Sequence, residues 1–197
     1  MTGLRERKKL ATRQHLAHVA TLMFIEHGFD RVTIAEIAEA AGVSKMTVTN
    51  YFPLKEDLVF DAHAGVVDSL AALVRTRPEG QSVVDALLAG FLTSLKARTV
   101  VSGYATPGFA RLVRESDRLR AREREIDELR EEALAAELAD EVAAPRFVAA
   151  VIAGVYRTLF RLTREHILAG LEWDEVCERM TEAATAGFDL IRPVVAA

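Results

Sequence analysis

Apolar residues recur at helical spacing along most of the chain, and runs of alternating β-branched residues are nearly absent. The first apolar stripe has its members at i, i+3, i+4 and i+7 positions: Leu16, Val19, Ala20, Met23 and Phe24. Five prolines fall near changes in sequence character, and Ala, Leu, Glu and Arg are abundant between them. The pattern predicts an all-α protein.

Capping residues, glycines and prolines divide this pattern into about nine helices. The predicted helices cover residues 4–27, 33–41, 44–51, 53–76, 82–101, 109–114, 117–138, 146–170 and 173–192. The segment 111–132 is densely charged, but its signs are mixed and an apolar residue recurs every seven positions. We therefore interpret it as a solvated amphipathic helix and not as a nucleic-acid-binding stripe.

The most informative segment is residues 33–52, which reads TIAEIAEAAGVSKMTVTNYF. Thr33 and Glu36 form a capping box, Gly42 breaks the first helix, and Ser44 caps the second. This spacing is typical of a helix-turn-helix, in which the second helix enters the major groove of DNA. Val43, Val48 and Phe52 are expected to face inward. Polar residues expected on the outward face are Ser44, Lys45, Thr47, Thr49 and Asn50.

The charge distribution supports DNA as a partner. Residues 1–13 hold five basic side chains and one acidic one, a local charge of +4, although the net charge of the chain is −4. A basic arm beside a helix-turn-helix is the electrostatic footprint of a DNA-binding protein. We expect Arg5, Lys8 and Lys9 to contact phosphates.

Several other function classes lack support in the sequence. The one cysteine, Cys177, excludes an internal disulfide framework and a cysteine-based zinc site. No glycine-rich phosphate loop, G-x-S-x-G elbow or H-E-x-x-H motif is present, so no enzyme activity, catalytic residue, cofactor or metal is expected. No segment has the character of a signal peptide or a membrane span, which favours a cytoplasmic location.

Residues 16–61 resemble the N-terminal domain of the TetR family of transcriptional regulators. The matching positions are Phe24, 27–29, Thr33, 37–38, 41–44, 51–52 and 55–58. Met46, Thr49 and Asn50 depart from the residues common at those positions in the family, so no base preference carries over.

The resemblance implies a homodimer with a DNA-binding domain at residues 1–53 and a helical effector-binding and dimerisation domain at residues 54–197. By position, Thr33 and Lys55 match phosphate contacts of the family, and Tyr51 matches an aromatic residue that contacts the DNA backbone. Most members are repressors that a small molecule releases from a near-palindromic operator. An activator, or a dimeric small-molecule-binding protein whose DNA binding is secondary, stays open as an alternative.

The effector and the dimer interface can be placed only as candidates. Aromatic residues that could line an effector pocket, or equally the core, are Phe91, Tyr104, Phe109, Tyr156 and Phe160. The helix predicted over residues 146–170 is apolar on more than one face, which indicates a partner surface, and small residues in the apolar row of the last helix allow close helix approach. Their candidate interface residues are Phe147, Val151, Val155, Leu159, Met180, Ala184, Gly187 and Phe188. The default effector is an apolar or amphipathic small molecule.

Overall fold

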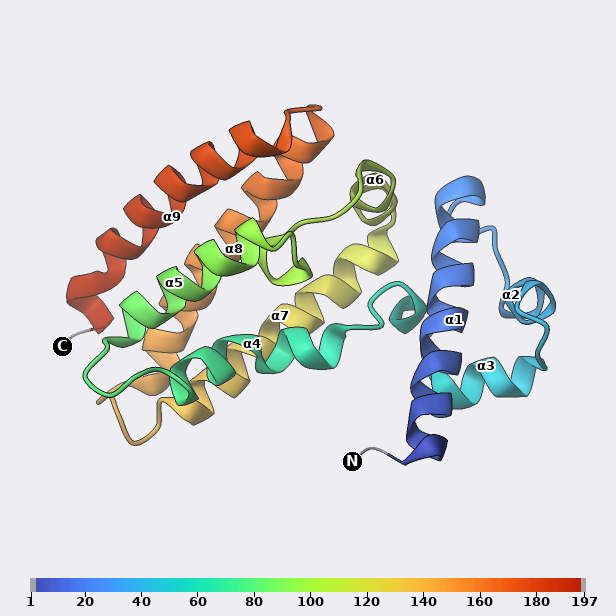
Figure 1. The fold of residues 1–197 in the computed structure, drawn as a ribbon, viewed down its shortest axis with the longest axis horizontal. Helices are drawn as coiled ribbons and strands as arrows, with labels where there is room; N and C mark the ends of the chain where they lie inside the picture. Colours follow the sequence, from blue (N-terminus) through green and yellow to red (C-terminus); the bar gives the residue numbers. More distant parts are fainter. Residues whose placement is uncertain (1–2, 196–197) are drawn as a thin grey trace. The chain divides into compact units, whose positions relative to one another are not determined.

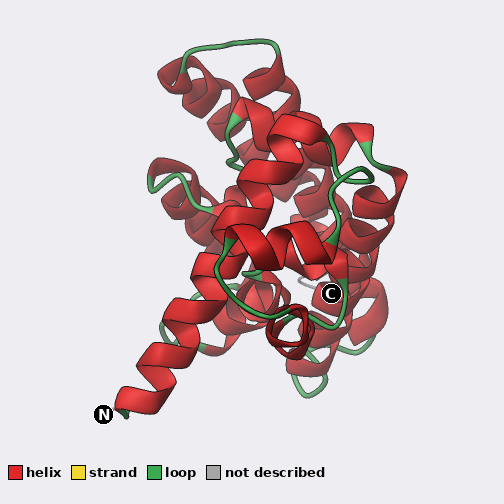
Figure 2. Ribbon diagram, turned by 90° about the vertical axis from the view of Figure 1, so that its right-hand side faces the viewer, coloured by secondary structure: helices red, strands yellow, loops and turns green. Residues whose placement is uncertain are grey.

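The computed structural model describes residues 3–195, and this part of the chain is built from nine α-helices and two short 3₁₀ helices with no strand (Figures 1 and 2). The elements are α1 (Leu4–His27), α2 (Ile34–Ala40), α3 (Lys45–Tyr51), η1 (Lys55–Leu58), α4 (His63–Arg75), α5 (Val83–Lys96), η2 (Val100–Ser102), α6 (Pro107–Glu115), α7 (Asp117–Glu137), α8 (Pro145–Leu168) and α9 (Trp173–Val195). The predicted all-α class is confirmed. None of the described helices combines the length and the apolar character needed to span a bilayer.

Local sequence signals explain most of the helix ends. Gly28 follows α1 with φ of 88°, a conformation that L side chains rarely adopt. The Ser82 side chain accepts a hydrogen bond from the Asp85 N–H and so caps α5. Pro145 stands at the first position of α8, where its missing N–H costs no helical hydrogen bond.

Two predicted helices are shorter than the sequence pattern indicated. The segment predicted as one helix over residues 53–76 is instead η1, a turn and then α4. The Arg13 side chain accounts for part of this break, because it binds both the carboxylate and the backbone carbonyl of Asp61 within the turn. The helix predicted over residues 82–101 ends at Lys96, because Arg98 takes a positive φ of 53°.

The chain divides into two compact units. The first comprises Met1–His63 and Arg111–Arg122, and the second comprises Ala64–Ala110 and Glu123–Ala197. The core of the first unit consists of apolar side chains from α1, α2, α3 and η1: Leu16, Ala20, Phe24, Ile37, Val48, Phe52 and Leu58. The four elements therefore share one core and hold α3 in a fixed place.

The core of the second unit lies between α5, α8 and α9, with contributions from α4 and α7. Tyr156 is its centre: its ring meets the edges of Phe91 and Phe188 at centroid distances of 5.9 and 5.7 Å. The Tyr156 hydroxyl donates to the Leu87 carbonyl at 2.8 Å, so its polar end is satisfied inside the core.

Candidate nucleic-acid interface

The α2–α3 pair is held rigid by hydrogen bonds that its own sequence supplies. Thr33 Oγ1 accepts from the Glu36 N–H at 3.2 Å, while the Thr33 N–H donates to Glu36 Oε2 at 2.7 Å, which completes the capping box. Ser44 Oγ caps α3 by accepting from the Thr47 N–H at 3.1 Å. Gly42 has φ of 67° in the turn between the helices. The geometry is that of a helix-turn-helix.

Some side chains on the exposed face of α3 form hydrogen bonds within the helix, and others form none to the described residues. The Ser44 and Thr47 hydroxyls bond each other at 2.9 Å, and Thr49 Oγ1 donates to the Met46 carbonyl at 3.1 Å. Lys45 and Asn50 are exposed and make no side-chain hydrogen bond to any described residue. Their donors and acceptors are therefore available to a ligand outside the unit.

Met46 is the residue of this face that sequence reasoning missed. It is 72% exposed, next to Lys45 and on the same side of α3 as Thr49 and Asn50. Its position three residues before Thr49 was the available signal. An exposed apolar side chain on this face can contact the methyl group of thymine.

The basic arm forms one wall of an open hollow beside the end of α3. Its volume is about 450 Å³, and its lining residues are Arg5, Glu6, Lys8, Lys9, Thr12 and Tyr51. Arg5, Lys8 and Lys9, which are predicted to contact phosphates, thus line the same hollow as Tyr51, which is predicted to contact the DNA backbone. Three cations around a concave surface attract an anion such as a phosphate group.

Arg13 connects α1 to the C-terminal end of α3. Its Nη1 donates to the Tyr51 carbonyl at 2.9 Å, its Nε donates to Asp61 at 2.5 Å, and its guanidinium lies 4.3 Å from the centroid of the Phe52 ring. The sequence placed Arg13 only among the charges of the arm. The structure instead makes it a positioning residue, because it fixes the backbone that carries Tyr51.

Lys55 is held within the first unit. Its Nζ donates to the Phe29 carbonyl at 2.5 Å and lies 4.4 Å from the centroid of the Phe29 ring. Desolvation by burial lowers the pKa of Lys55 from its ordinary value. The ammonium group has three donors, so a phosphate contact by this residue stays a prediction beside its packing role.

The capping box gives the first unit a testable pH dependence. Hydrogen bonds from the Thr33 N–H and hydroxyl lower the pKa of Glu36 below its ordinary value of 4.5. Because the folded-state pKa is depressed, the stabilisation is present above the unfolded-state pKa and is lost as pH falls through the folded-state pKa. In thermal melts from pH 7 to pH 3, the Tm difference between wild type and Glu36→Gln is expected to shrink below pH 4.5.

Glu39→Gln is the matched control for this melt series, because Glu39 is an exposed acid on the same helix. Its Tm difference from wild type should stay nearly constant with pH. Equal pH dependence in the two variants would remove the capping box as the cause.

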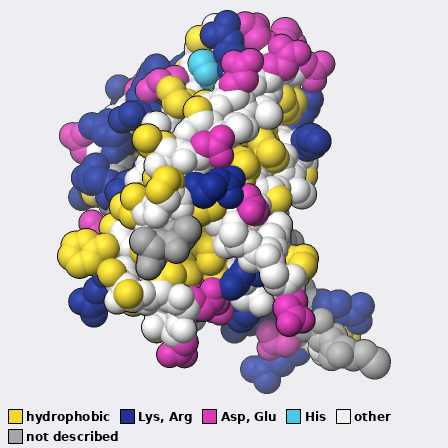
Figure 3. Space-filling model, turned by 90° about the vertical axis from the view of Figure 1, so that its left-hand side faces the viewer, with side chains coloured by type: hydrophobic (Ala, Val, Ile, Leu, Met, Phe, Trp, Pro, Cys, Tyr) yellow, Lys and Arg dark blue, Asp and Glu magenta, His cyan; other side chains and the backbone are white. Residues whose placement is uncertain are grey.

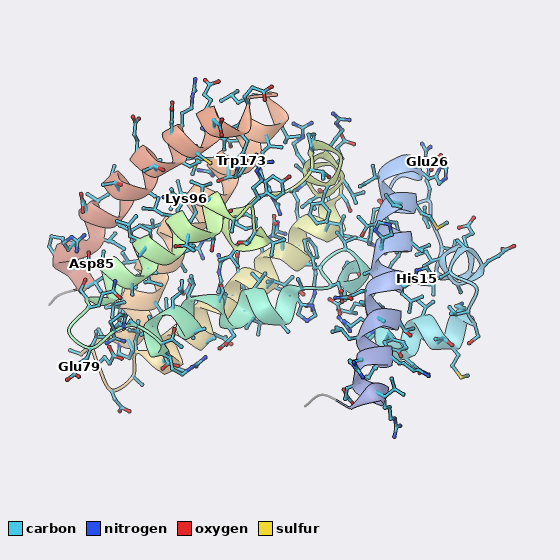
Figure 4. All side chains as sticks on the ribbon, viewed as in Figure 1. His15, Glu26, Glu79, Asp85, Lys96 and Trp173 are labelled. Carbon is cyan, nitrogen blue, oxygen red and sulfur yellow. The ribbon has the colours of Figure 1, made fainter. Side chains whose placement is uncertain are left out.

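The candidate effector aromatics occupy two kinds of position in the second unit. Phe91 and Tyr156 are buried in the hydrophobic core. Tyr104, Phe109 and Phe160 are half-buried, and Tyr104 packs edge-on against Trp173, labelled in Figure 4, at a centroid distance of 4.9 Å. Phe91 and Tyr156 are therefore core residues in this structure, and a pocket-lining role for Tyr104, Phe109 and Phe160 stays a prediction.

Half of the candidate dimer-interface residues are covered within the single chain. Leu159, Met180, Ala184 and Phe188 have almost no exposed surface in the single chain. Because they are already covered, they can add no area for a partner to bury, and they pack α9 on α8 and α5 of the same chain. Val151, Val155 and Gly187 are half-buried.

The exposed apolar positions of α8 and α9 are different ones. Phe147 is 77% exposed, Leu190 is 79% exposed and Val194 is 53% exposed. Figure 3, which shows the left-hand side of Figure 1, has several groups of hydrophobic side chains at the surface between charged ones. The sequence contained this signal: Leu190 and Val194 are four residues apart and so lie on one side of α9.

Sequence reasoning also missed two arginines of the second unit, one buried and one largely covered. Arg130 of α7 is 1% exposed, and the Arg164 side chain of α8 is 14% exposed. Arg130 stands four residues after Ile126 and four before Leu134, both buried, so its place on the apolar stripe was the available signal. Among the described residues, no three His, Cys, Asp or Glu side chains group in a way that could hold a metal ion.

Comparison with known proteins assigns these features to a family. Residues 16–62 match the family model described as bacterial regulatory proteins, tetR family. The chain is 29% identical over 203 residues to the HTH-type transcriptional regulator TcmR of Streptomyces glaucescens, an alignment that covers 97% of this chain and 87% of TcmR. The matching relatives are transcriptional regulators and not enzymes.

Solved structures agree on the fold. A tetR-family transcriptional regulator from Streptomyces coelicolor superposes with a TM-score of 0.55 at 24% identity, covering 99% of this chain and 84% of the other. NalD of Pseudomonas aeruginosa, a secondary repressor of a multidrug efflux pump, superposes with a TM-score of 0.60 at 17% identity, covering 90% of this chain and 96% of NalD. The helix-turn-helix, the matched residues and the fold agree: residues 16–62 form a DNA-binding domain of the TetR family of transcriptional regulators, and the chain as a whole is similar to members of that family.

Proposed function

We propose that this protein is a dimeric repressor that binds a near-palindromic operator through α3 and is released by a small molecule. The observation that carries the proposal is the pair of free polar side chains, Lys45 and Asn50, on a helix fixed by the Ser44 cap. Regulators of this family bind operators as dimers with small-molecule effectors. NalD, which shares the fold, is a repressor, and this supports repression here.

In this proposal each part of the first unit has its own role on DNA. Residues 1–53 form the DNA-binding part. The base-reading face consists of Ser44, Lys45, Thr47, Thr49 and Asn50, and the phosphate-contacting residues are Arg5, Lys8, Lys9, Thr33, Tyr51 and Lys55. Hydrogen bonds to base edges select the sequence, whereas phosphate contacts fix the register without selecting it. A cytoplasmic location follows from this role.

Binding to duplex DNA from upstream of the protein's own gene tests the proposal. The wild type is expected to prefer this duplex to a scrambled duplex of equal composition. Lys45→Ala with Asn50→Ala should abolish most of that preference, because one good base contact contributes about 1–3 kcal/mol of discrimination. Asp30→Ala, an exposed change outside α3, should keep it. A preference unchanged by the double substitution would contradict α3 as the reading helix.

The dimer is proposed to use the exposed apolar residues Phe147, Leu190 and Val194, beside the half-buried Val151, Val155 and Gly187. Leu190→Glu should weaken dimerisation about 100-fold, because a carboxylate would be desolvated in the interface. Sedimentation equilibrium measures the change.

Leu129→Glu is the control for the dimer, since Leu129 is an exposed leucine of α7 in the same unit. It should leave the dimer intact. A Leu190→Glu protein that dimerises as the wild type does would exclude this surface.

The effector is proposed to act by population shift between two conformations. The chain passes from the first unit to the second near the start of α4 and again inside α7, which is unbroken from Asp117 to Glu137. A ligand that favours one arrangement of these helices would change the separation of the two reading helices in the dimer. The coupling equals the difference in the ligand's affinity for the two states, typically about 1–3 kcal/mol.

A further inference from the structure

Two buried polar atoms of the second unit lack a partner. Among the residues that the structure describes, only Nε of Arg130 and Nε of Arg164 are buried side-chain nitrogen or oxygen atoms with no hydrogen-bond partner. Buried polar atoms are nearly always bonded, and a guanidinium group can only donate. Each unpartnered N–H therefore presents a donor to an acceptor that the chain itself does not supply.

The two arginines belong to one seam between α7 and α8. Arg130 Nη2 pairs with Asp127 of its own helix at 2.8 Å, and Arg164 Nη1 reaches across to Glu123 of α7 at 2.5 Å. Glu123 and Asp127 are four residues apart, one helical turn. The positive charges of Arg130, Arg157 and Arg164 all act on Asp127, so both guanidinium groups lie near this carboxylate, together with that of Arg157.

Aromatic rings accompany both guanidinium groups. The Arg130 Cζ lies 5.7 Å from the centroid of the Tyr156 ring, and the Arg164 Cζ lies 4.5 Å from that of the Phe160 ring. Tyr156 and Phe160 are one turn apart on α8, about 6 Å along its axis. The seam thus combines cationic donors with flat apolar walls, and the more exposed Arg164 marks its accessible end.

Burial also affects the carboxylate of the seam. Desolvation by burial is the largest influence on Asp127 and raises the pKa of its carboxyl group above the ordinary value, whereas the charges of Arg130, Arg157 and Arg164 act to lower it. A neutral apolar ligand would leave both Nε–H donors unpartnered.

We propose that the α7–α8 seam is the effector site and that it takes an aromatic anion, whose charged oxygens accept from Nε of Arg164 and Arg130 while its ring packs along the half-buried Phe160. This inference rests on the proposed ligand-responsive function and narrows its effector from an apolar or amphipathic molecule to an aromatic carboxylate, sulfonate or phenolate. Charge-assisted hydrogen bonds supply the selectivity.

A matched pair of fluorescent probes tests the site in the full chain. The probes are 1-anilinonaphthalene-8-sulfonate and N-phenyl-1-naphthylamine, which share their rings and differ in the sulfonate group. Arg164→Met is expected to weaken sulfonate binding about tenfold, while the neutral probe changes less than twofold, as one lost charge-assisted hydrogen bond predicts. Arg164→Lys, which keeps the charge but loses the Nε–H, should also weaken sulfonate binding.

Arg161→Met is the control, because Arg161 lies on the same helix, is exposed and pairs with Glu165. It should leave the binding of both probes unchanged. Near-ultraviolet circular dichroism checks that Arg130→Met keeps the wild-type packing. A folded Arg130→Met protein should also bind the sulfonate probe more weakly while its binding of the neutral probe changes little.

Three results would overturn the site: no binding of the sulfonate probe by the wild type, equal effects of Arg164→Met on both probes, or a loss in Arg161→Met equal to that in Arg164→Met. DNA binding by the same proteins separates this inference from the proposed function. If the protein binds DNA selectively but Arg164→Met affects both probes equally, the proposed effector site is wrong and the regulator function stands. If Arg164→Met weakens only the sulfonate probe but the protein does not bind DNA, the regulator function is wrong and the anion site stands.

Discussion

Replacing Phe188 with alanine is expected to lower the free energy of unfolding of the second unit by about 3–5 kcal/mol. Phe188 has no exposed surface and packs edge-on against Tyr156 at a centroid distance of 5.7 Å. Truncation removes buried apolar area and leaves a cavity among side chains that the helices hold in place. Urea unfolding followed by circular dichroism measures the change, at several protein concentrations so that dimerisation is accounted for.

The Phe188 result also separates core packing from dimerisation. Leu129→Ala, a truncation at an exposed position of α7, is the control and should change the free energy of unfolding by about 0.5 kcal/mol or less. If Phe188→Ala left the unfolding free energy within about 1 kcal/mol of wild type but dissociated the dimer, Phe188 would be an interface residue, as its spacing along α9 indicated.

Replacing Arg5, Lys8 and Lys9 together with glutamine is expected to produce the largest change in DNA binding. These side chains line the hollow beside Tyr51, and each neutralised phosphate contributes about 0.9 to the slope of log K against log salt. The slope should therefore become shallower by about 2.7. The loss should be similar for operator and scrambled DNA, because phosphate contacts carry no sequence information.

Lys96→Gln controls for the general effect of removing positive charge. Lys96 is an exposed lysine of α5 in the second unit, labelled in Figure 4. Its removal should leave the salt slope unchanged. An unchanged slope in the triple variant would exclude the arm from the DNA interface, and a loss confined to the operator would show that the arm reads bases.

The parts of the fold that could be predicted from sequence are those with local causes. Thr33 and Ser44 cap α2 and α3 through hydrogen bonds to residues only three positions away, so the residue pattern alone was enough to predict the helix-turn-helix. The break between η1 and α4 could not be predicted in this way, because it depends partly on Arg13, which reaches Asp61 across 48 positions of sequence.

The sequence pattern also does not show which distant segment covers a given apolar position. An apolar stripe has the same pattern whether it packs on a helix of its own chain or on a second copy, so Met180 and Leu190 could not be separated by spacing alone. The same limit applies to Arg130: its place on the apolar stripe between Ile126 and Leu134 indicates burial, but the spacing does not show that Tyr156 of α8 lies against it.

The most direct test of the dimeric operator-binding account is selection of bound sequences from a random duplex pool by the full-length protein. The account predicts a two-fold symmetric consensus whose half-sites are separated by about 34–36 Å or a multiple of it. Lys45→Ala should change the preferred base within each half-site and keep the spacing. Enrichment of no sequence, or of an asymmetric site unaffected by Lys45→Ala, would contradict it.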